Sequence, residues 1–343
     1  MILFLFLLAL AICISSQLVK DNAAHALSVE QSQAIKGVFV ITVFFSHFCS
    51  YVVFDKWYDA LMLKYCHWLG QLMVVPFLFY SGYGIFESVK KKGLSYVDKF
   101  PKKRILKILL HFDMAVVIFV VYDIFAAPEK LSILKVLLSF IAWESVGNSN
   151  WFIFAILCAY LFTYISLHFF RNNLLKAVVF IGVLCFLYVV IVSRFKPGYW
   201  FDTILSFPLG CAVSLYKEKL FVKNYVVWFC LCVMSFFVLV AINYDLISNF
   251  YIRSQIAMIA MSALILLLSM RVKVKSKVLS WFGANVFGIY ILQRLPMNFG
   301  KYMNWNEQSI YFYFIFCFSV TLLLSFCFNK MTMLIDSKLF KDK

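Results

Sequence analysis

Charged residues are scarce in this sequence. Asp, Glu, Lys and Arg make up 14% of the 343 residues, against about 25% in an ordinary soluble domain. Glycine and proline are also few, at 12 and 6 residues, and no linker-like stretch divides the chain. Hydrophobic residues reach 64%, which excludes a disordered chain and argues against a soluble enzyme. The composition therefore predicts a membrane protein that lies among lipids.

Motifs for metals and nucleic acids are missing as well. The ten cysteines form no C-x-x-C pair, and no two of the five histidines are spaced i, i+4, so we expect no metal site. The net charge is +16, but basic cytoplasmic loops explain most of this charge in a membrane protein. Without a basic face on a fold of its own, no nucleic-acid partner is expected.

Long apolar runs indicate helices that cross a bilayer, since about 20 such residues span it. We expect an all-α, polytopic membrane helix bundle of about 10–11 transmembrane helices. Residues 1–29 form an extra N-terminal helix, either a retained anchor or signal-like, and residues 30–343 form one transmembrane domain. The segment 131–143 is apolar but short, which favours a re-entrant or interfacial piece. The eleven runs are 2–19, 36–54, 69–87, 105–126, 151–170, 174–193, 200–216, 224–242, 250–270, 280–298 and 309–328.

Lysines and arginines predict the orientation of these runs, because cytoplasmic loops are enriched in them. Twenty-three of the 32 basic residues fall in alternate connections and the C-terminal tail. The densest group lies in the loop 88–104 and just after it. We therefore expect this loop and the C-terminus to be cytoplasmic.

Ionisable residues inside apolar runs are costly to insert into a bilayer, so each is a candidate for function. His47 stands out, because it lies in the apolar run from Gly37 to Phe54 and imidazole takes up a proton near neutral pH. A histidine that only hydrogen-bonds a neighbouring helix is the alternative. The other candidates are His111, Asp113, Asp123, Asp202, Arg253 and Arg294, and Lys36 begins the same run as His47, about 16 Å away along a helix.

Two further features lie near the basic loop. Ser81 is followed by Gly82 and Gly84, which favours either close helix packing or a polar notch for a ligand. Arg104 and Lys107 are spaced i, i+3 and should share one helix face. That arrangement suits the phosphates of a cytoplasmic ligand, and it suits lipid headgroups equally well.

A series of short motifs in order along residues 30–330 resembles the acyltransferase 3 family, membrane-bound O-acyltransferases of bacterial surface glycans. Lys36 and His47, with ten residues between them, are similar to the family's Arg/Lys-X10-His signature. Gln33, Lys36 and Lys107 depart from commoner Asp, Arg and Arg, and Gln293 stands where many members have His. The other matching motifs are Val75–Tyr83, Lys103–Ile108, Asn150–Ile153, Phe207–Gly210, Trp281–Gly283 and Ile289–Leu292.

The resemblance implies an O-acyltransferase, most commonly an O-acetyltransferase, in the bacterial cytoplasmic (inner) membrane. Acetyl-CoA or another acyl-CoA would be the co-substrate, with no bound cofactor. The acceptor would be a polysaccharide or lipid-linked glycan, and glycan synthesis machinery or a second copy of the chain are possible partners. His47 would be the general base, and the residues expected to bind substrate or acyl donor are Lys36, Ser81, Arg104, Lys107 and Trp151.

Two alternatives remain open from the residues alone. A transporter or flippase for a glycan or small solute would also place charges inside the membrane, although the paired repeats typical of transporters are not visible in the sequence. A catalytically silent partner of a glycan synthase is the other. Transfer of a labelled acyl group by the purified protein would distinguish both from an acyltransferase.

Overall fold

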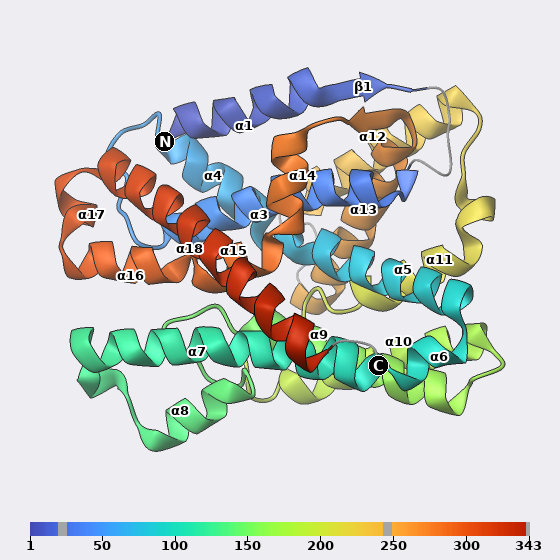
Figure 1. Cartoon of the computed structure of the whole chain (residues 1–343). Helices are drawn as coiled ribbons and strands as arrows, with labels where there is room; N and C mark the ends of the chain where they lie inside the picture. The colour runs from blue at the N-terminus through green and yellow to red at the C-terminus, as the bar shows by residue number, and fades with distance from the viewer. Residues whose placement is uncertain (20–25, 243–248, 341–343) are drawn as a thin grey trace.

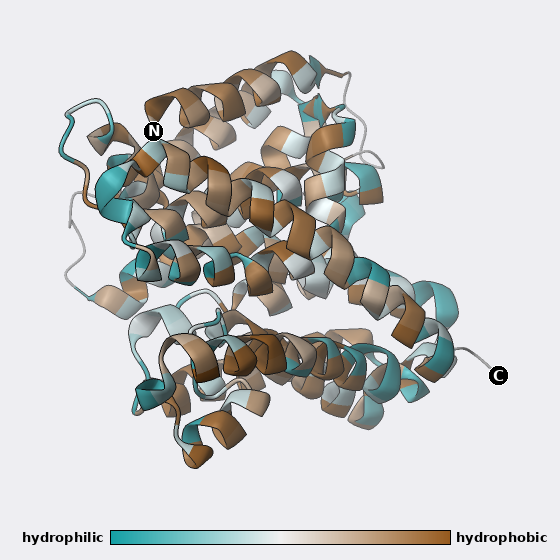
Figure 2. Cartoon of the chain, turned by 60° about the vertical axis from the view of Figure 1, so that its left-hand side comes forward, coloured by the Kyte–Doolittle hydropathy of each residue, from teal (hydrophilic) through white to brown (hydrophobic). Residues whose placement is uncertain are grey.

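The computed structural model describes residues 1–19, 26–242 and 249–340, and it confirms an all-α polytopic bundle (Figure 1). Within these residues, eight helical stretches are long and apolar enough to cross a membrane. Figure 2 shows hydrophobic residues over most helix surfaces and hydrophilic residues mainly toward helix ends and loops. The eight are α3 (Val29–Cys49), Ala60–Lys92, Pro101–Ala126, α9 (Trp151–Phe169), α10 (Leu174–Val192), α12 (Tyr225–Ile242), α13 (Phe250–Arg271) and α18 (Ile310–Leu339).

Side-chain caps fix the starts of several of these helices. The Ser28 hydroxyl accepts a hydrogen bond from the Gln31 amide at the start of α3. Asn173, Asn249 and Ser309 do the same for α10, α13 and α18. A capping oxygen satisfies one of the amide donors that a helix N-terminus leaves free.

Two of the long stretches are interrupted rather than straight. Ala60–Lys92 consists of α4 (Ala60–Leu69), the 3-10 turn η1 (Gly70–Val74) and α5 (Val75–Lys92). Pro101–Ala126 begins with the π-helical turn η2 (Pro101–Leu106) and continues as α7 (Lys107–Ala126). Gly70 has φ +47° and ψ −130°, a conformation that glycine adopts without steric cost.

Three of the eleven expected spans are not among these eight long apolar stretches. Residues 2–19 form the 14-residue helix α1 (Ile2–Ser15) and the strand β1 (Ser16–Leu18). Residues 200–216 contain a turn and then α11 (Ser206–Leu220). Polar Asn285 and Gln293 separate three short helices in and around 280–298, which are α14 (Lys277–Ala284), α15 (Val286–Leu292) and α16 (Arg294–Tyr302).

The remaining elements are short. The strand β2 (Val272–Val274) pairs antiparallel with β1, with Ser16 opposite Val274. The segment 131–143 contains the eight-residue helix α8 (Ile133–Phe140), consistent with its expected shortness. The others are α6 (Leu94–Asp98), η3 (Pro128–Lys130), η4 (Gly198–Trp200) and α17 (Trp305–Gln308).

Glycines bring two pairs of helices into backbone contact. A Cβ on Gly37 of α3 would lie 1.9 Å from the Leu279 carbonyl oxygen of α14, and a Cβ on Gly283 would lie 1.8 Å from that of Gln33. In the same way, a Cβ on Gly82 of α5 would lie 2.1 Å from the Phe207 carbonyl oxygen of α11. Small residues permit such crossings in membrane bundles. Close packing therefore accounts for Gly82, whereas a Cβ on Gly84 would meet nothing within 4 Å.

Candidate active site

His47 lies in the last turn of α3, since the helix ends at Cys49. The apolar run continues to Phe54, but the chain leaves the helix at Ser50, whose hydroxyl donates a hydrogen bond to the His47 carbonyl at 2.6 Å. His47 is therefore near the end of its helix and not at the middle of a span that reaches residue 54. Lys36 is three helical turns earlier, and the 1.5 Å rise keeps the two about 16 Å apart.

The His47 ring faces a cavity of about 400 Å³ where several chain segments meet. The lining is mostly polar. Such concave sites with convergent polar groups are the usual place for ligands. The lining residues include His47 with Ser46 and Ser50, Gly70 and Gln71 of η1, Asn148, Ser149 and Asn150, Trp151, Tyr199, Tyr290 and Arg294.

Several buried polar atoms of this cavity have no hydrogen-bond partner among the described residues. They include His47 Nδ1, Asn148 Nδ2 and Arg294 Nε. Arg294 also lies close enough to the imidazole for an electrostatic interaction, and the Tyr290 ring lies 6.2 Å from it. Because buried polar groups in proteins are normally paired, these atoms point to a polar substrate as their partner.

The segment 141–150 brings four polar residues to the cavity through a tightly held loop. Asn150 Nδ2 donates to the Ala142 carbonyl at 2.9 Å, and the Asn148 carboxamide oxygen accepts from the Ser145 hydroxyl at 3.1 Å. Gly147 has φ +87°, a left-handed conformation that favours glycine. Lys196 donates to the Trp143 carbonyl at 2.9 Å. The loop is therefore fixed by its own hydrogen bonds and positions Asn148 and Ser149.

The structure brings some of the expected site residues together and separates others. Trp151 lines the His47 cavity at the start of α9 and packs edge-on against Tyr199. Ser81 and Arg104 both lie beside the Tyr160 side chain. Lys36 does not line the His47 cavity, and it is not among the residues beside Tyr160. His47 and Trp151 thus form one group, and Ser81 and Arg104 form a second.

Arg104 and Lys107 turn toward different partners. Arg104 Nε donates to the Tyr96 hydroxyl at 3.1 Å, whereas Lys107 Nζ pairs with Asp336 of α18 at 2.6 Å. The same carboxylate is 2.9 Å from His111 Nε2. The π-helical turn that ends at Leu106 has more residues per turn than an α-helix, so the expected i, i+3 alignment does not hold there.

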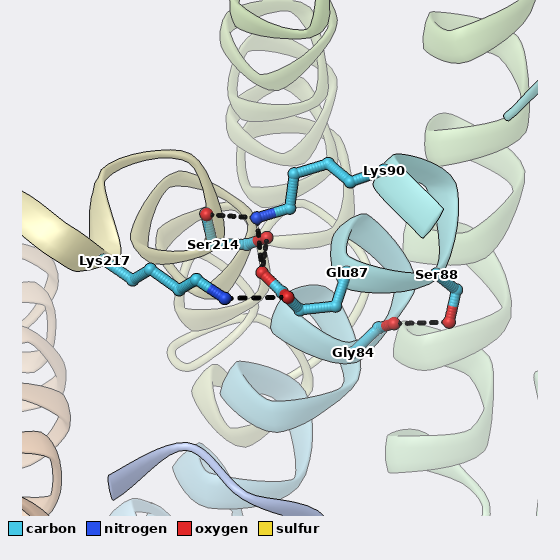
Figure 3. Close-up of polar contacts among 6 residues, drawn as sticks. All are labelled: Gly84, Glu87, Ser88, Lys90, Ser214 and Lys217. Atoms are coloured by element: carbon cyan, nitrogen blue, oxygen red, sulfur yellow. Dashed lines mark hydrogen bonds and ion pairs between the residues drawn. The ribbon is translucent and has the colours of Figure 1, made fainter. Parts of the chain in front are cut away.

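The far end of α5 carries an ion-pair cluster that joins it to α11 (Figure 3). Glu87 is paired with Lys90 and, at 3.0 Å, with Lys217, and it accepts a hydrogen bond from the Ser214 hydroxyl at 2.8 Å. Lys90 also donates to the Ser214 carbonyl at 2.6 Å. These lysines therefore connect two helices through Glu87, and their ammonium groups are already paired rather than available to a ligand.

Sequence reasoning did not single out Asn148, Ser149 and Tyr290 of the His47 cavity, and it named Arg294 only as one of several ionisable candidates. Arg294 had a detectable signal, since it is an arginine inside an apolar run. Its neighbour Gln293 is fully buried and donates from Nε2 to the Tyr290 carbonyl at 3.1 Å. Arg294 therefore reaches the cavity, while Gln293 holds the turn between α15 and α16.

Together, the apolar helices and the buried polar cavity define a multi-pass membrane protein with a histidine-containing site. A protein-family model described as an acyltransferase domain matches residues 30–330 of the chain. The chain belongs to this acyltransferase 3 family and is a membrane acyltransferase. Membership favours catalysis over the transporter alternative. No curated protein and no solved structure matches the chain.

Proposed function

We propose that this protein is an O-acetyltransferase that moves an acetyl group from cytoplasmic acetyl-CoA to a hydroxyl of a cell-surface or exported polysaccharide. The observation that carries this proposal is the His47 imidazole in a polar cavity at the end of an apolar helix, whose Nδ1 has no hydrogen-bond partner among the described residues. Sugar hydroxyls need a base at the moment they attack. The imidazole of a neutral histidine can act as this base in the His47 cavity.

In the proposed reaction, a His47 ring nitrogen takes the proton of the acceptor hydroxyl as its oxygen attacks the thioester carbonyl. A carbon–oxygen bond forms, and the negative charge on the carbonyl oxygen is met by N–H donors. Arg294, with its free Nε donor, is suited to that role. The carbon–sulfur bond then breaks, and the departing CoA sulfur receives the proton.

The donor is expected to arrive from the basic side of the bundle. The helix α5 begins at the cavity, where Val74 precedes it, and ends at Lys92, so it spans roughly 25 Å. Ser81 lies partway along it, and Arg104 lies beside Tyr160 near Ser81. We therefore assign Arg104 to the phosphates of acyl-CoA and Trp151 to the reacting end. The family resemblance alone supports a role for Lys36 and Lys107 in donor binding, since Lys107 is paired with Asp336.

The proposed setting is the bacterial inner membrane, with the C-terminus and the loop before Arg104 in the cytoplasm. The acceptor is a polysaccharide or lipid-linked glycan that reaches the opposite face. Partners would be glycan synthesis proteins or a second copy of the chain. The distribution of lysine and arginine supports this orientation.

The test uses the purified full chain with radiolabelled acetyl-CoA and polysaccharide from the organism of origin. General-base assistance typically contributes about 10²–10⁴-fold to a rate, so His47→Ala and His47→Gln should lose at least 99% of transfer while still inserting into the membrane. The exposed His168 offers a matched control, and His168→Gln should retain activity. Acetylation by His47→Ala at the parent rate would overturn the proposal.

A further inference from the structure

A second cavity opens beside the His47 cavity and contains an aspartate that the proposed reaction does not use. Its volume is about 360 Å³. Gly70 and Gln71 line both cavities, so the two adjoin at the turn η1. The other walls come from α4, the turn before α11 and the start of α13, and the lining includes His67, Trp68, Asp202, Thr203, Phe250, Arg253 and Ser254.

Asp202 is the acidic residue in the lining of this second cavity. The residue is 7% exposed, and its carboxylate Oδ1 has no hydrogen-bond partner on any other described residue. Gln255 Nε2 donates to the Asp202 backbone carbonyl at 3.0 Å and so does not occupy the carboxylate. The carboxylate interacts with the backbone amide of its own residue, but its Oδ1 receives no hydrogen bond from another described residue. A buried carboxylate oxygen without a donor is costly, so a ligand with hydroxyl donors is a suitable partner.

The chemistry of the walls distinguishes the two substrates of the proposed function. Among the described residues, the cavity is lined by one carboxylate, Asp202, and one guanidinium, Arg253, so it lacks the excess positive charge that would favour the phosphates of acyl-CoA. The Asp202 carboxylate can instead accept hydrogen bonds from neutral hydroxyls. Trp68 and Phe250 add aromatic surface, which packs against the apolar face of a sugar ring. Pockets that combine aromatic walls with a few polar groups are suited to small polar ligands.

Open space borders Gly70, which lines both cavities. Gly70 has φ +47°, and a Cβ built there would meet no atom within 4 Å. A ligand held by Asp202 can therefore extend past Gly70 toward His47 without meeting a side chain at that position. Both cavities border the start of η1, and the basic end of α5 lies roughly 25 Å from there along the helix.

We infer that the cavity around Asp202 is an acceptor subsite that holds a neutral, hydroxyl-rich sugar unit beside His47. This inference rests on the proposed function and adds to it the place and the chemical class of the acceptor. Asp202 would accept hydrogen bonds from sugar hydroxyls, and Trp68 and Phe250 would cover the ring. Asp202 would bind the acceptor, and His47 would take its proton.

The test measures acceptor and donor use separately on the purified full chain. The acceptor is envelope polysaccharide from the organism of origin, stripped of its esters with mild alkali, and transfer from radiolabelled acetyl-CoA is followed as its concentration rises. Donor binding is measured without acceptor, as the rise in unfolding temperature with acetyl-CoA. Asp202→Asn keeps the shape of the residue, and Ser254→Trp fills the cavity if the first variant does not fold.

Asp202→Asn should raise the half-saturating polysaccharide concentration about tenfold or more, because hydrogen bonds to charged groups are among the stronger ones. Its affinity for acetyl-CoA should stay within about twofold of the parent. Asp113 supplies the matched control, since it has an unpartnered Oδ1 on α7 and lines neither cavity. Asp113→Asn should leave both measurements unchanged.

Two outcomes would overturn the inference, and they can be told apart. If Asp202→Asn and Ser254→Trp saturate with polysaccharide like the parent while His47→Ala is inactive, the subsite is wrong and the proposed function stands. If the parent binds acetyl-CoA but acetylates none of the polysaccharide, the glycan acceptor of the proposed function fails, and the subsite fails with it.

Discussion

Arg294 is the residue that the structure adds most clearly to the site. It lines the His47 cavity, and its Nε has no partner among the described residues. A guanidinium at this place can stabilise the negative charge that develops on the thioester oxygen. Removing one such donor typically costs 10²–10³-fold in rate. Arg294→Met should therefore lower kcat about 100-fold or more with both substrates saturating.

Arg294→Lys offers a test of charge against shape, since lysine keeps the charge but lacks the planar fork of donors. It should recover part of the activity lost in Arg294→Met. The exposed Arg194 gives the matched control, and Arg194→Met should behave like the parent. A kcat for Arg294→Met within threefold of the parent would remove Arg294 from the proposed reaction.

The variant Arg104→Ala should distinguish an effect on donor binding from an effect on the chemical step. The contacts of Arg104 are Tyr96 and Tyr160, away from the His47 cavity. Loss of a charged contact to phosphate should raise the KM for acetyl-CoA about tenfold, with a smaller effect on the KM for polysaccharide. We expect this pattern for Arg104→Ala in donor and acceptor titrations, and parent values for the exposed neighbour variant Lys102→Ala. A larger effect on the acceptor would contradict a donor site here.

At the scale of helices, the crossing of α3 and α14 sets the position of His47. Gly37 lies ten residues before His47 on the same helix, and a Cβ there would overlap the Leu279 carbonyl oxygen at 1.9 Å. Overpacking of this kind costs about 1–3 kcal/mol. Gly37→Ala should lower the free energy of unfolding by that amount and reduce transfer, because α3 must shift.

Gly182 in α10 supplies the control for this effect, since a Cβ there would meet nothing within 4 Å. Alanine is a better helix former than glycine by about 1 kcal/mol, so Gly182→Ala should leave stability unchanged or raise it. Thermal unfolding in detergent measures both variants. Equal unfolding temperatures for the two would show that the close crossing does not determine stability.

The helices were easier to predict from the sequence than their interruptions. The apolar run 174–193 forms the single helix α10, as expected for about 20 apolar residues that can span a bilayer. The run 280–298 looks equally apolar, yet polar Asn285 and Gln293 divide it, and this division brings Tyr290 and Arg294 to the site.

His47 and Trp151 could be singled out from the sequence, one as an ionisable residue in an apolar run and both from the family resemblance. The loop residues Asn148 and Ser149 could not. Short polar loop residues are ordinary in sequence, and only the hydrogen bonds within 141–150 show where they point. The separation of Arg104 from Lys107 was also hidden, because it depends on a π-helical turn.

At the scale of the whole molecule, the proposed reaction requires its two substrates to reach opposite ends of the bundle. The loop after α5 contains the dense basic group, and the short helix α17 connects α16 to α18 in a segment with little basic charge. The positive-inside rule predicts that the first lies in the cytoplasm and the second outside. An epitope inserted after Gly93 or after Lys343 should therefore be hidden from antibody in intact spheroplasts and become accessible on lysis.

An epitope inserted after Asn306, in α17, should be accessible before lysis. Each tagged chain is first checked for acetyl transfer, so that only correctly folded protein is compared. Antibody access at Gly93 and protection at Asn306 would reverse the orientation. The Asp202 cavity and the basic end of α5 would then exchange sides, and a cytoplasmic donor would no longer meet Arg104. The sidedness of these two insertions thus tests whether one chain can join a cytoplasmic thioester to an exported sugar.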